Sequence, residues 1–356
     1  MASPIPSSIK GLVYTGLNTT ALQSRPAPTL TTPTDAIVKV TKTTICGTDL
    51  HIRKGDVPSC PTGRILGHEG VGVVQATGSS VTRFKPGDHV LISCITSCAT
   101  CDFCRRGMYS HCRTGGWQLG HAIDGTQATH VRIPHADASL HPVPGGVDEG
   151  ALVMLSDIFP TGLEVGVLRG KVKPGCSVAI VGAGPVGLAA LCAAQMYSPH
   201  RTIVVDMDAH RLEVARGMGA EHVISNAGGA DAVVKEVLAL TEGLGCDTVI
   251  EAVGIPATFE LCQLLLAPGG TLANVGVHGT KVDLQLQDLW ARNIEITAAL
   301  VDTVSTPMLL KLFQAGKIHP EKMITHRFKF DDIEKAYDTF SAAGTTGALK
   351  VLIEMD

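Results

Sequence analysis

The sequence predicts an α/β fold of two domains, in which a barrel-like antiparallel β domain precedes a doubly wound parallel sheet. Up to about residue 154, short β-rich segments such as Ala36 to Val40 and Val71 to Ala76 alternate with Gly/Pro turns. From about Lys173 the pattern changes to apolar strand, Gly-rich turn and helix, which is typical of βαβ units. The chain has 356 residues, of which 45% are hydrophobic, so it can build two cores of ordinary size.

Strands and helices alternate through the second half of the sequence. Ser177 to Val181 is an apolar strand, and the turn after it leads into a helix over Leu188 to Tyr197. The same order repeats, which predicts a parallel sheet covered by helices. Further strands are expected at Thr202 to Val205, His222 to Ile224, Thr248 to Ile250, Thr271 to Val275 and Ile294 to Ala298, and helices at Ala230 to Leu240 and Ala257 to Leu265. The last stretch, which we expect to return to the first domain, adds helices at Pro307 to Ala315 and Asp331 to Ala342 and a strand at Leu349 to Ile353.

Composition and charge exclude several classes of protein. The net charge of −4 comes from 29 basic and 33 acidic residues without a long block of one sign, which argues against a nucleic-acid partner. Met1 to Lys10 lacks the apolar segment of a secretory signal, and no apolar run is long enough to cross a bilayer. Eleven cysteines, several of them clustered, favour metal binding over a secreted disulfide framework. We therefore expect a cytoplasmic protein with reduced thiols and no membrane partner.

A Gly-rich turn after the strand Ser177 to Val181 predicts a dinucleotide site. The stretch Gly182, Ala183, Gly184, Pro185, Val186, Gly187 fits GxGxxG. Its first glycine permits the tight turn, its second lets backbone approach a pyrophosphate, and its third lets the helix pack on the strand. Asp206 closes the next strand, where a carboxylate accepts hydrogen bonds from ribose hydroxyls and repels a 2′-phosphate. The pattern favours NAD over NADP.

Four cysteines lie within fifteen residues, at Cys98, Cys101, Cys104 and Cys112. Four thiolates satisfy tetrahedral zinc and leave no open position, which indicates a structural zinc site. An iron–sulfur cluster and a chance grouping of buried thiols are the alternatives.

Two further motifs carry candidate metal ligands. Cys46 to His51 reads CGTDLH, and Gly67 to Gly72 reads GHEGVG. Either motif alone is weak, because a lone histidine on a loop is more often structural. Together with the four-cysteine lobe, the GAGPVG turn and Asp206, they occur in an order that resembles the zinc-dependent medium-chain alcohol dehydrogenases along essentially the whole chain. The residue that matches the third zinc ligand of this family is Asp157, and here the sequence resembles the secondary-alcohol and glutathione-independent formaldehyde dehydrogenases.

The resemblance implies a GroES-like β-barrel catalytic domain over residues 1–154 with a structural zinc lobe at 94–113. It also implies a Rossmann NAD-binding domain over 155–298 and a C-terminal segment, 299–356, that returns to the catalytic domain. Cys46, His68 and Asp157 are then ligands of a catalytic zinc, and Glu69 is a fourth or outer ligand. Asp157 departs from the liver-type enzymes, which have Cys there, and a helix cap is the alternative role for it.

The resemblance also assigns a proton relay and further cofactor contacts. Thr48 supplies the hydroxyl beside the zinc, and His51 is the relay base because an imidazole exchanges protons near neutral pH. Their alternatives are a backbone cap and a surface histidine. The other residues assigned to the cofactor are Thr161, Arg211, Val253, Val275, Gly276, Val277 and Lys350, although Arg211 and Lys350 could each be an ordinary surface charge.

The function implied is reversible oxidation of primary or secondary alcohols to aldehydes or ketones, with hydride passing from a zinc-bound alkoxide to NAD. Each chain would hold two zinc ions and form a homo-oligomer, a dimer or a tetramer. A formaldehyde or short-aldehyde dehydrogenase or dismutase on the same site is one alternative, and a non-catalytic nucleotide-binding sensor is another. The sequence does not indicate which alcohol or carbonyl compound is used.

Overall fold

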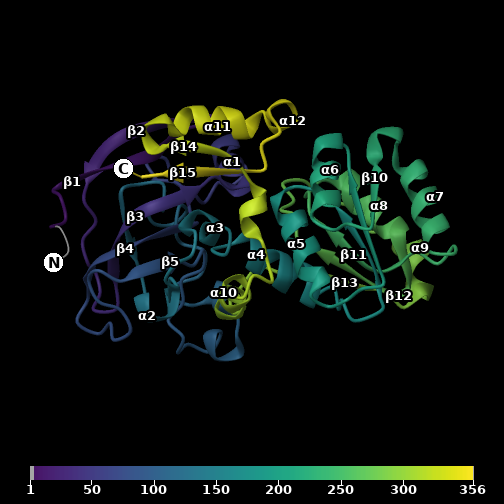
Figure 1. The fold of residues 1–356 in the computed structure, drawn as a ribbon, viewed down its shortest axis with the longest axis horizontal. Coiled ribbons are helices and arrows are strands. Elements are labelled where there is room, and N and C mark those ends of the chain that lie inside the picture. The colour runs from purple at the N-terminus through teal and green to yellow at the C-terminus, as the bar shows by residue number, and fades with distance from the viewer. Residues whose placement is uncertain (1–3, 356) are drawn as a thin grey trace. The chain divides into compact units, whose positions relative to one another are not determined.

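The computed structural model describes residues 4–355, and these form two compact units (Figure 1). Unit 1 contains the chain up to Asp157 and again from Asp302 onward, and unit 2 contains Ile158–Val301. The C-terminal segment therefore belongs to the same unit as the N-terminal half. No helix in the described part of the chain is long and apolar enough to span a bilayer.

Unit 1 is built on a seven-stranded sheet and a separate β-hairpin. The strands of the sheet run in the order β14-β15-β3-β4-β5-β7, with β6 on β3, and all pairs except β14–β15 are antiparallel. Its strands and those of the hairpin are β1 (Ser8–Gly16), β2 (Thr19–Pro26), β3 (Ala36–Thr44), β4 (Gly70–Thr77), β5 (His89–Ile92), β6 (His130–Ile133), β7 (Leu140–Pro142), β14 (Ile324–Lys329) and β15 (Lys350–Glu354). Its helices are α1 (Gly47–Lys54), α2 (Ala136–Ser139), α3 (Glu149–Val153), α10 (Thr306–Gln314), α11 (Ile333–Ser341) and α12 (Ala343–Thr346), with short 3₁₀ turns at Cys104–Arg106, Tyr109–His111, Pro320–Met323 and Phe330–Asp332.

The C-terminal strand joins unit 1 through its pairing with β3. Leu352 pairs with Thr44 and Glu354 with Lys42, so the start of β15 lies beside the end of β3, where the chain enters α1. Helix α11 packs against β14 and β15 (Figure 1). Its apolar residues Ile333, Ala336 and Tyr337 are buried at helical spacing, and this face closes the core on that side.

Unit 2 is a six-stranded parallel sheet in the order β10-β9-β8-β11-β12-β13. The order reverses between β8 and β11, and ligands of open α/β sheets bind at the carboxyl ends of strands at such a point. Every residue of β8 is buried, as expected for a central parallel strand covered on both faces. The strands are β8 (Ser177–Val181), β9 (Arg201–Asp206), β10 (His222–Ser225), β11 (Cys246–Glu251), β12 (Leu266–Asn274) and β13 (Glu295–Ala298). The helices are α4 (Ile158–Thr161), a π-helical segment (Gly162–Leu168), α5 (Pro185–Gln195), α6 (Ala209–Gly217), α7 (Ala230–Leu240), α8 (Pro256–Leu265) and α9 (Leu286–Leu289), with 3₁₀ turns at Asn226–Gly228 and Trp290–Arg292.

The α/β fold class predicted from sequence is confirmed. Strand β8 and helix α5 flank the predicted Gly-rich turn, and Pro185 occupies the first turn of α5, where its missing N–H costs nothing. The hairpin β1–β2 and the π-helical segment were not predicted.

Packing of α5 on β8 depends on the absence of a side chain at Gly187. A Cβ there would lie 1.8 Å from the carbonyl oxygen of Gly182, whereas one at Gly217 of α6 would meet nothing within 4 Å. We expect Gly187→Ala to lower the free energy of unfolding by roughly 1–3 kcal/mol, because overpacking forces the backbone apart. The control Gly217→Ala should be neutral or stabilise by up to about 1 kcal/mol, since alanine favours a helix. Calorimetric melting of both variants checks this, and an unchanged melting temperature for Gly187→Ala would contradict the packing argument.

Candidate active site

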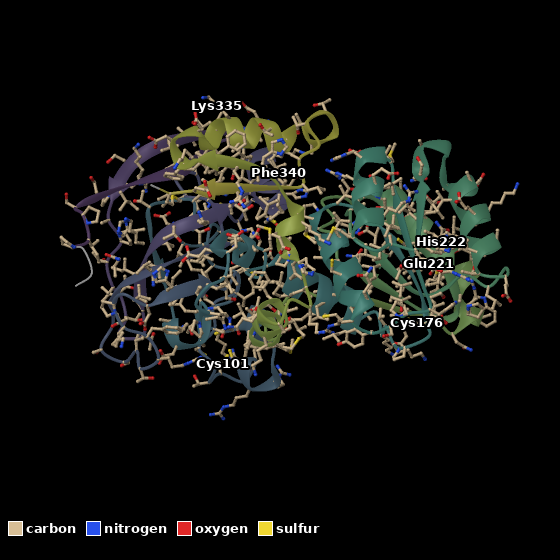
Figure 2. All side chains as sticks on the ribbon, viewed as in Figure 1. Cys101, Cys176, Glu221, His222, Lys335 and Phe340 are labelled. Atoms are coloured by element: carbon tan, nitrogen blue, oxygen red, sulfur yellow. The ribbon has the colours of Figure 1, made fainter. Side chains whose placement is uncertain are left out.

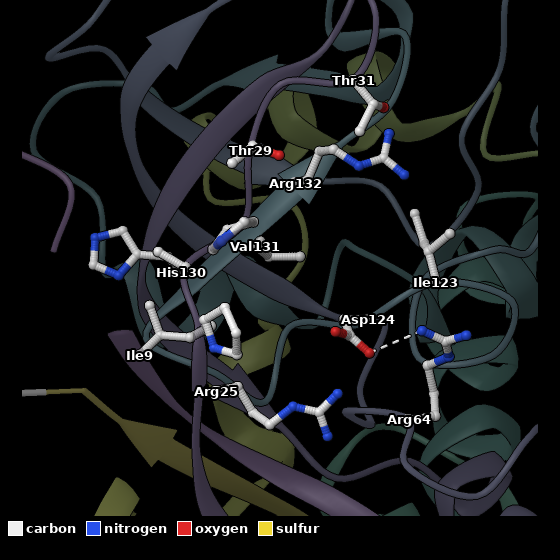
Figure 3. A pocket seen from close by; sticks show the side chains of 13 residues that line it. Ile9, Arg25, Thr29, Thr31, Arg64, Ile123, Asp124, His130, Val131 and Arg132 are labelled. Carbon is white, nitrogen blue, oxygen red and sulfur yellow. Dashed lines mark hydrogen bonds and ion pairs between the residues drawn. The ribbon is translucent and has the colours of Figure 1, made fainter. Parts of the chain in front are cut away.

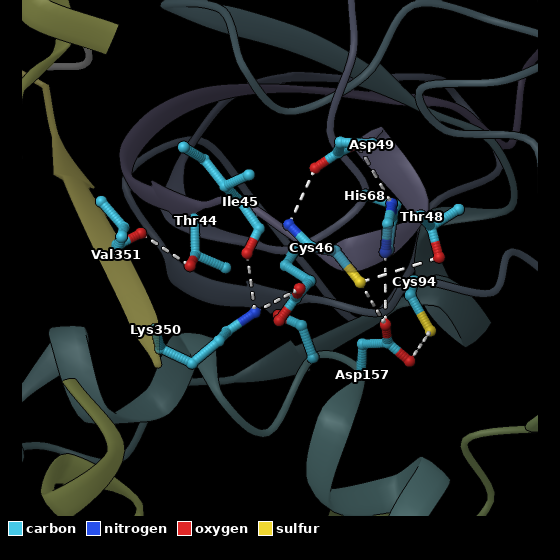
Figure 4. Close-up of polar contacts among 12 residues, drawn as sticks. Thr44, Ile45, Cys46, Thr48, Asp49, His68, Cys94, Asp157, Lys350 and Val351 are labelled. Carbon is cyan, nitrogen blue, oxygen red and sulfur yellow. Dashed lines mark hydrogen bonds and ion pairs between the residues drawn. The ribbon is translucent and has the colours of Figure 1, made fainter. Parts of the chain in front are cut away.

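Four potential metal ligands converge inside unit 1. The ligand atoms of Cys46, His68, Glu69 and Asp157 all lie within 4.8 Å of one another. Cys46 precedes α1, His68 and Glu69 precede β4, and Asp157 lies just before α4, so three separate segments supply them. The His68 Nε2 atom lies 3.2 Å from Asp157 Oδ2, and Cys46 Sγ lies 3.8 Å from the same oxygen (Figure 4).

The local sequence explains how Cys46 is held. Cys46 is the N-cap of α1, and its backbone N–H donates to Asp49 Oδ2 at 2.9 Å. This contact satisfies an amide of the first turn and ties the thiol-bearing residue to a fully buried carboxylate. Thr48 lies beside the thiol, with its Oγ1 atom 3.7 Å from Cys46 Sγ.

Glu69 is paired with Lys350, and both side chains are 1% exposed. The Lys350 ammonium donates to Glu69 Oε1 at 2.7 Å and to the carbonyl oxygen of Ile45 at 3.2 Å. Burial raises the pKa of Glu69 to about 7 against the opposing effect of the ammonium. Burial acts to lower the pKa of Lys350, but the charges of Glu69, Cys46 and Asp157 together with the hydrogen bond to Glu69 outweigh it, and the net shift is upward.

Lys350 is therefore not a surface charge, as one reading of the sequence allowed. The pairing of β15 with β3 carries its side chain into unit 1, toward Glu69. The expected approach to a cofactor rested on the family resemblance, and the reading as a surface charge rested on the position of Lys350 before a terminal strand, a pattern that contains no information on the register of that strand.

Electrostatics at the cluster favour a bound cation. Burial acts to lower the pKa of His68, but its hydrogen bonds to Asp157 and Cys46 and the charges of Cys46 and Asp49 together outweigh burial and hold the pKa well above the ordinary value. Glu69 Oε2 is buried and accepts no hydrogen bond from any residue in 4–355. Thiolate, imidazole and carboxylate are the ligand types that zinc takes. The residues present therefore fit a zinc ion.

Two residues beside the cluster were not assigned from sequence. Cys94 is buried and its thiol lies 3.5 Å from Asp157 Oδ1 (Figure 4). Burial, followed by the charge of Asp157, raises the pKa of the Cys94 thiol well above its ordinary value. Asp49 lies within the CGTDLH motif, so its position three residues after Cys46 could have indicated its contact with that residue. Nothing in the sequence around Cys94 indicates its contact with Asp157.

His51 lies in the middle of α1, five residues after Cys46. It follows Thr48 by three residues, so the two side chains occupy neighbouring positions on one face of the helix. Its Nδ1 atom lies 2.9 Å from Asp56 Oδ2, and one third of the side chain is exposed to solvent.

The four cysteines of the lobe also converge. Their sulfur atoms lie within 4.8 Å of one another, and Cys98 and Cys104 are 4.0 Å apart. A tetrahedral zinc with bonds of about 2.3 Å requires sulfur atoms about 3.8 Å apart, close to this value. The backbone N–H groups of Cys101 and Cys98 donate to sulfur atoms within the cluster, a contact that stabilises thiolates.

The lobe thiols differ in acidity. Burial acts to raise the pKa of Cys98, but hydrogen bonds from Thr100, Cys101 and Cys112 outweigh it and lower the pKa to about 5. Hydrogen bonds from the backbone lower the pKa of Cys101, which lies on the projecting lobe of unit 1 (Figure 2). Low thiol pKa values favour metal ligation, because the thiolate is the ligand.

In unit 2, the predicted cofactor residues gather at the carboxyl ends of β8, β11 and β12. Gly182 has a φ of +107°, and a Cβ there would lie 2.6 Å from Val253. The backbone N–H groups of Val275 and Gly276 donate to the carbonyl oxygen of Glu251, and Val277 follows them with its side chain exposed. A Cβ at Gly184 would meet only the Arg211 guanidinium, at 3.9 Å, so this side of the turn is open to a ligand.

Asp206 lies at this turn as well. Its carboxylate accepts hydrogen bonds from the backbone N–H groups of Ala183, at 2.6 Å, and Asp208, at 2.8 Å. Thr161 ends α4 beside Gly162, which packs against Ala190 of α5. A glycine-lined turn with an open face and a nearby carboxylate fits a dinucleotide.

Glu251 was not assigned from sequence, although it follows the predicted strand Thr248 to Ile250. It is fully buried, and its carboxylate accepts from the N–H groups of Val253 and Gly254 and from the Thr258 hydroxyl. It therefore holds the loop after β11 in place.

A separate cavity of about 390 Å³ lies in unit 1, and none of the predicted site residues lines it (Figure 3). Arg25, Arg64 and Arg132 are among its lining residues. Arg64 pairs with Asp124 at 2.9 Å and Arg132 with Asp35 at 3.1 Å. Two of the three arginines are thus neutralised, and we assign no chemistry to this cavity.

Comparison with known proteins agrees with this geometry. Residues 32–145 match the family described as "Alcohol dehydrogenase GroES-like domain", and residues 185–315 match "Zinc-binding dehydrogenase". An alcohol dehydrogenase of Cupriavidus necator is 36% identical over 366 residues, which cover 97% of this chain and 98% of that protein. The solved apo structure of zinc dependent alcohol dehydrogenase 2 from Streptococcus pneumonia is 51% identical, with a TM-score of 0.95, and the match covers 98% of this chain and 99% of that one.

Two solved structures of lower identity contain a nucleotide. An alcohol dehydrogenase from E. coli CFT073 with NADH is 27% identical, with a TM-score of 0.88, and a zinc-binding dehydrogenase from Sinorhizobium meliloti 1021 with NADP is 28% identical, with a TM-score of 0.86. Each match covers 98% of this chain and 100% of the other. The two family matches and the relatives along nearly the whole length show that the chain belongs to the zinc-type medium-chain alcohol dehydrogenases.

Proposed function

We propose that the protein is an NAD-dependent zinc alcohol dehydrogenase that interconverts primary or secondary alcohols with aldehydes or ketones. The observation that carries the proposal is the convergence of Cys46, His68 and Asp157 in one buried cluster of unit 1. The relatives named as alcohol dehydrogenases support the same reaction. Three protein ligands that leave a position for water or substrate are typical of catalytic rather than structural zinc.

Different residues in and beside the cluster would bind the zinc and transfer the proton. Cys46, His68 and Asp157 would hold the zinc, and Glu69, which is paired with Lys350 through Oε1, would be a fourth or outer ligand. When bound, zinc supplies a Lewis acid that makes an alcohol hydroxyl more acidic. Thr48 Oγ1, beside the cluster, would accept the hydroxyl proton as it gives up its own, and His51, three residues further along α1, would take up a proton and release it to solvent. Asp56 holds the His51 ring by its contact with Nδ1.

Unit 2 would bind the hydride acceptor. Gly182, Gly184 and Gly187 shape the turn for a pyrophosphate, and the Asp206 carboxylate is available for ribose hydroxyls. The four lobe cysteines would hold a second, structural zinc, because they leave no position open for a substrate. The nicotinamide ring accepts hydride when the dinucleotide is bound.

We also propose a cytoplasmic homo-oligomer. No disulfide joins the cysteines within residues 4–355, which suits a reducing compartment. Strand β13 has one edge unpaired within residues 4–355, and Trp290, five residues before this strand, is 75% exposed. Open edges and exposed aromatic side chains are typical of surfaces that pair with another chain. Light scattering should give a mass at least twice 37.2 kDa, and a monomer at micromolar concentration would contradict this part of the proposal.

The ligand role of Asp157 can be tested with an isosteric change. Asp157→Asn should reduce NADH formation from 2-propanol, ethanol or benzyl alcohol by at least about 100-fold, and the zinc content should fall from about two ions per chain to about one. Asp231→Asn, an exposed aspartate on α7, is the matched control and should change neither. Full turnover and zinc content in Asp157→Asn would show that Asp157 is not a ligand.

The choice of NAD can be tested at Asp206. A hydrogen bond to a charged group contributes about 1.5–3 kcal/mol, so Asp206→Ser should raise the KM for NAD by roughly 10- to 100-fold. The same change should improve NADP, because Arg211 borders the turn and a carboxylate no longer repels the 2′-phosphate. Adding Arg211→Ala should remove that gain. Wild-type protein that uses NADP as well as NAD would contradict the proposed preference.

A further inference from the structure

A buried hydrogen-bonded chain connects helix α11 with the proposed catalytic metal ligands. Its first member, Gln127, lies just before β6 and is completely buried. The Gln127 Nε2 group donates to the carbonyl oxygen of Thr44 at 3.2 Å and to Asp49 Oδ2 at 3.1 Å. Its Oε1 atom accepts from the Tyr337 hydroxyl at 2.8 Å. Two acceptors on one side and a hydroxyl donor on the other determine the orientation of this amide.

Asp49 is the member of the chain next to the ligands. Its Oδ2 atom accepts from the backbone of Cys46 and from Gln127, so that oxygen is fully engaged. Its Oδ1 atom is buried, accepts no hydrogen bond within residues 4–355, and lies 3.9 Å from His68 Nδ1. A metal-ligating histidine donates its second ring N–H to an outer carboxylate, and such partners control the orientation of the ring. Asp49 thus faces both Cys46 and His68.

Tyr337 is the far end of the chain and comes from the C-terminal segment. It is 1% exposed, and the Arg53 guanidinium of α1 lies over its ring, 5.0 Å from the centroid. Burial raises the pKa of its hydroxyl well above the ordinary value, so the hydroxyl is protonated and donates to Gln127. Gln127 is the hydrogen-bond partner of the buried Tyr337 hydroxyl. A tyrosine that only filled an apolar core could be replaced by phenylalanine without leaving a polar group unpartnered.

We propose that Gln127 and Tyr337 are positioning residues for the catalytic metal, which act by holding Asp49 against Cys46 and His68. Helix α11 thereby controls how tightly the catalytic site retains its metal. The inference rests on the proposed zinc site of Cys46, His68 and Asp157. It assigns no step in the reaction to either residue, and the lobe cysteines lie outside this chain of contacts.

The test measures zinc release, because the two sites of one chain give an internal control. Wild-type holoenzyme is mixed with a chromogenic chelator, and zinc transfer from the catalytic site and from the lobe is resolved as two kinetic phases. The phase that is missing in Asp157→Asn is the catalytic one. Loss of an outer contact weakens metal binding by about 10- to 100-fold. Tyr337→Phe, which removes one hydroxyl, should accelerate the catalytic phase by about 10-fold, and Gln127→Met by up to about 100-fold. The lobe phase should remain unchanged in both.

A matched control comes from the same core. Tyr14 belongs to the apolar cluster that contains Tyr337, but within residues 4–355 its side chain makes no hydrogen bond to Gln127 or Asp49. Tyr14→Phe should leave both release phases as in the wild type. If Gln127→Met does not fold, Tyr337→Phe still decides the question, because it leaves the packing of the ring intact.

The outcomes separate the two proposals. Two zinc ions in the wild type, with unchanged catalytic release in both variants, would overturn the positioning role and leave the proposed function standing. Acceleration of both phases by the same factor would also overturn it, because a general loss of stability acts on both sites. A wild type that holds only the lobe zinc would refute the proposed catalytic site, and the positioning role with it. With cobalt in the catalytic site, a shifted absorption band in Tyr337→Phe would support an altered ligand geometry.

Discussion

The structure of unit 1 depends on how it neutralises a cluster of ionisable side chains that are buried away from water. Cys46, His68, Glu69 and Asp157 lie together, and Lys350 is a permanent cation paired with Glu69. Burying an isolated carboxylate or thiolate costs much free energy. An opposite charge or a bound metal ion offsets this cost in such a cluster. The raised pKa values of Glu69 and His68 follow from this constraint: one carboxyl is driven toward its neutral form, and the imidazole is driven toward its charged form. A divalent cation bound here would lower both pKa values, because it favours the carboxylate and the neutral imidazole.

The C-terminal segment takes part in this arrangement. Strand β15 pairs with β3, which brings Lys350 to Glu69, and helix α11 brings Tyr337 to Gln127. The ligands Cys46 and His68 are thus supported from residues about three hundred positions away in the sequence. The glycines at the Gly-rich turn of unit 2 act by leaving space: Gly187 lets α5 approach β8, and Gly184 leaves the turn open.

Features encoded by local patterns could be predicted from sequence. The alternation after residue 173 predicts the parallel sheet, since apolar runs and Gly-rich turns act over a few residues. The lobe cysteines share one short stretch, so their convergence follows from spacing. The contacts of Lys350, Gln127 and Cys94 could not be predicted, because each depends on the register or packing of segments far apart in the chain. Asp157 is intermediate: only the resemblance to a family distinguished a ligand from a helix cap.

The central claim is that the cluster of Cys46, His68 and Asp157 is a metal site distinct from the lobe. A crystal structure of the zinc-replete protein, with anomalous diffraction recorded on both sides of the zinc absorption edge, tests it most directly. The account predicts two anomalous peaks per chain, one among the four lobe sulfur atoms and one within about 2.0–2.3 Å of Cys46, His68 and Asp157 ligand atoms. A single peak in the lobe, with the Cys46 cluster unchanged at full zinc loading, would contradict it.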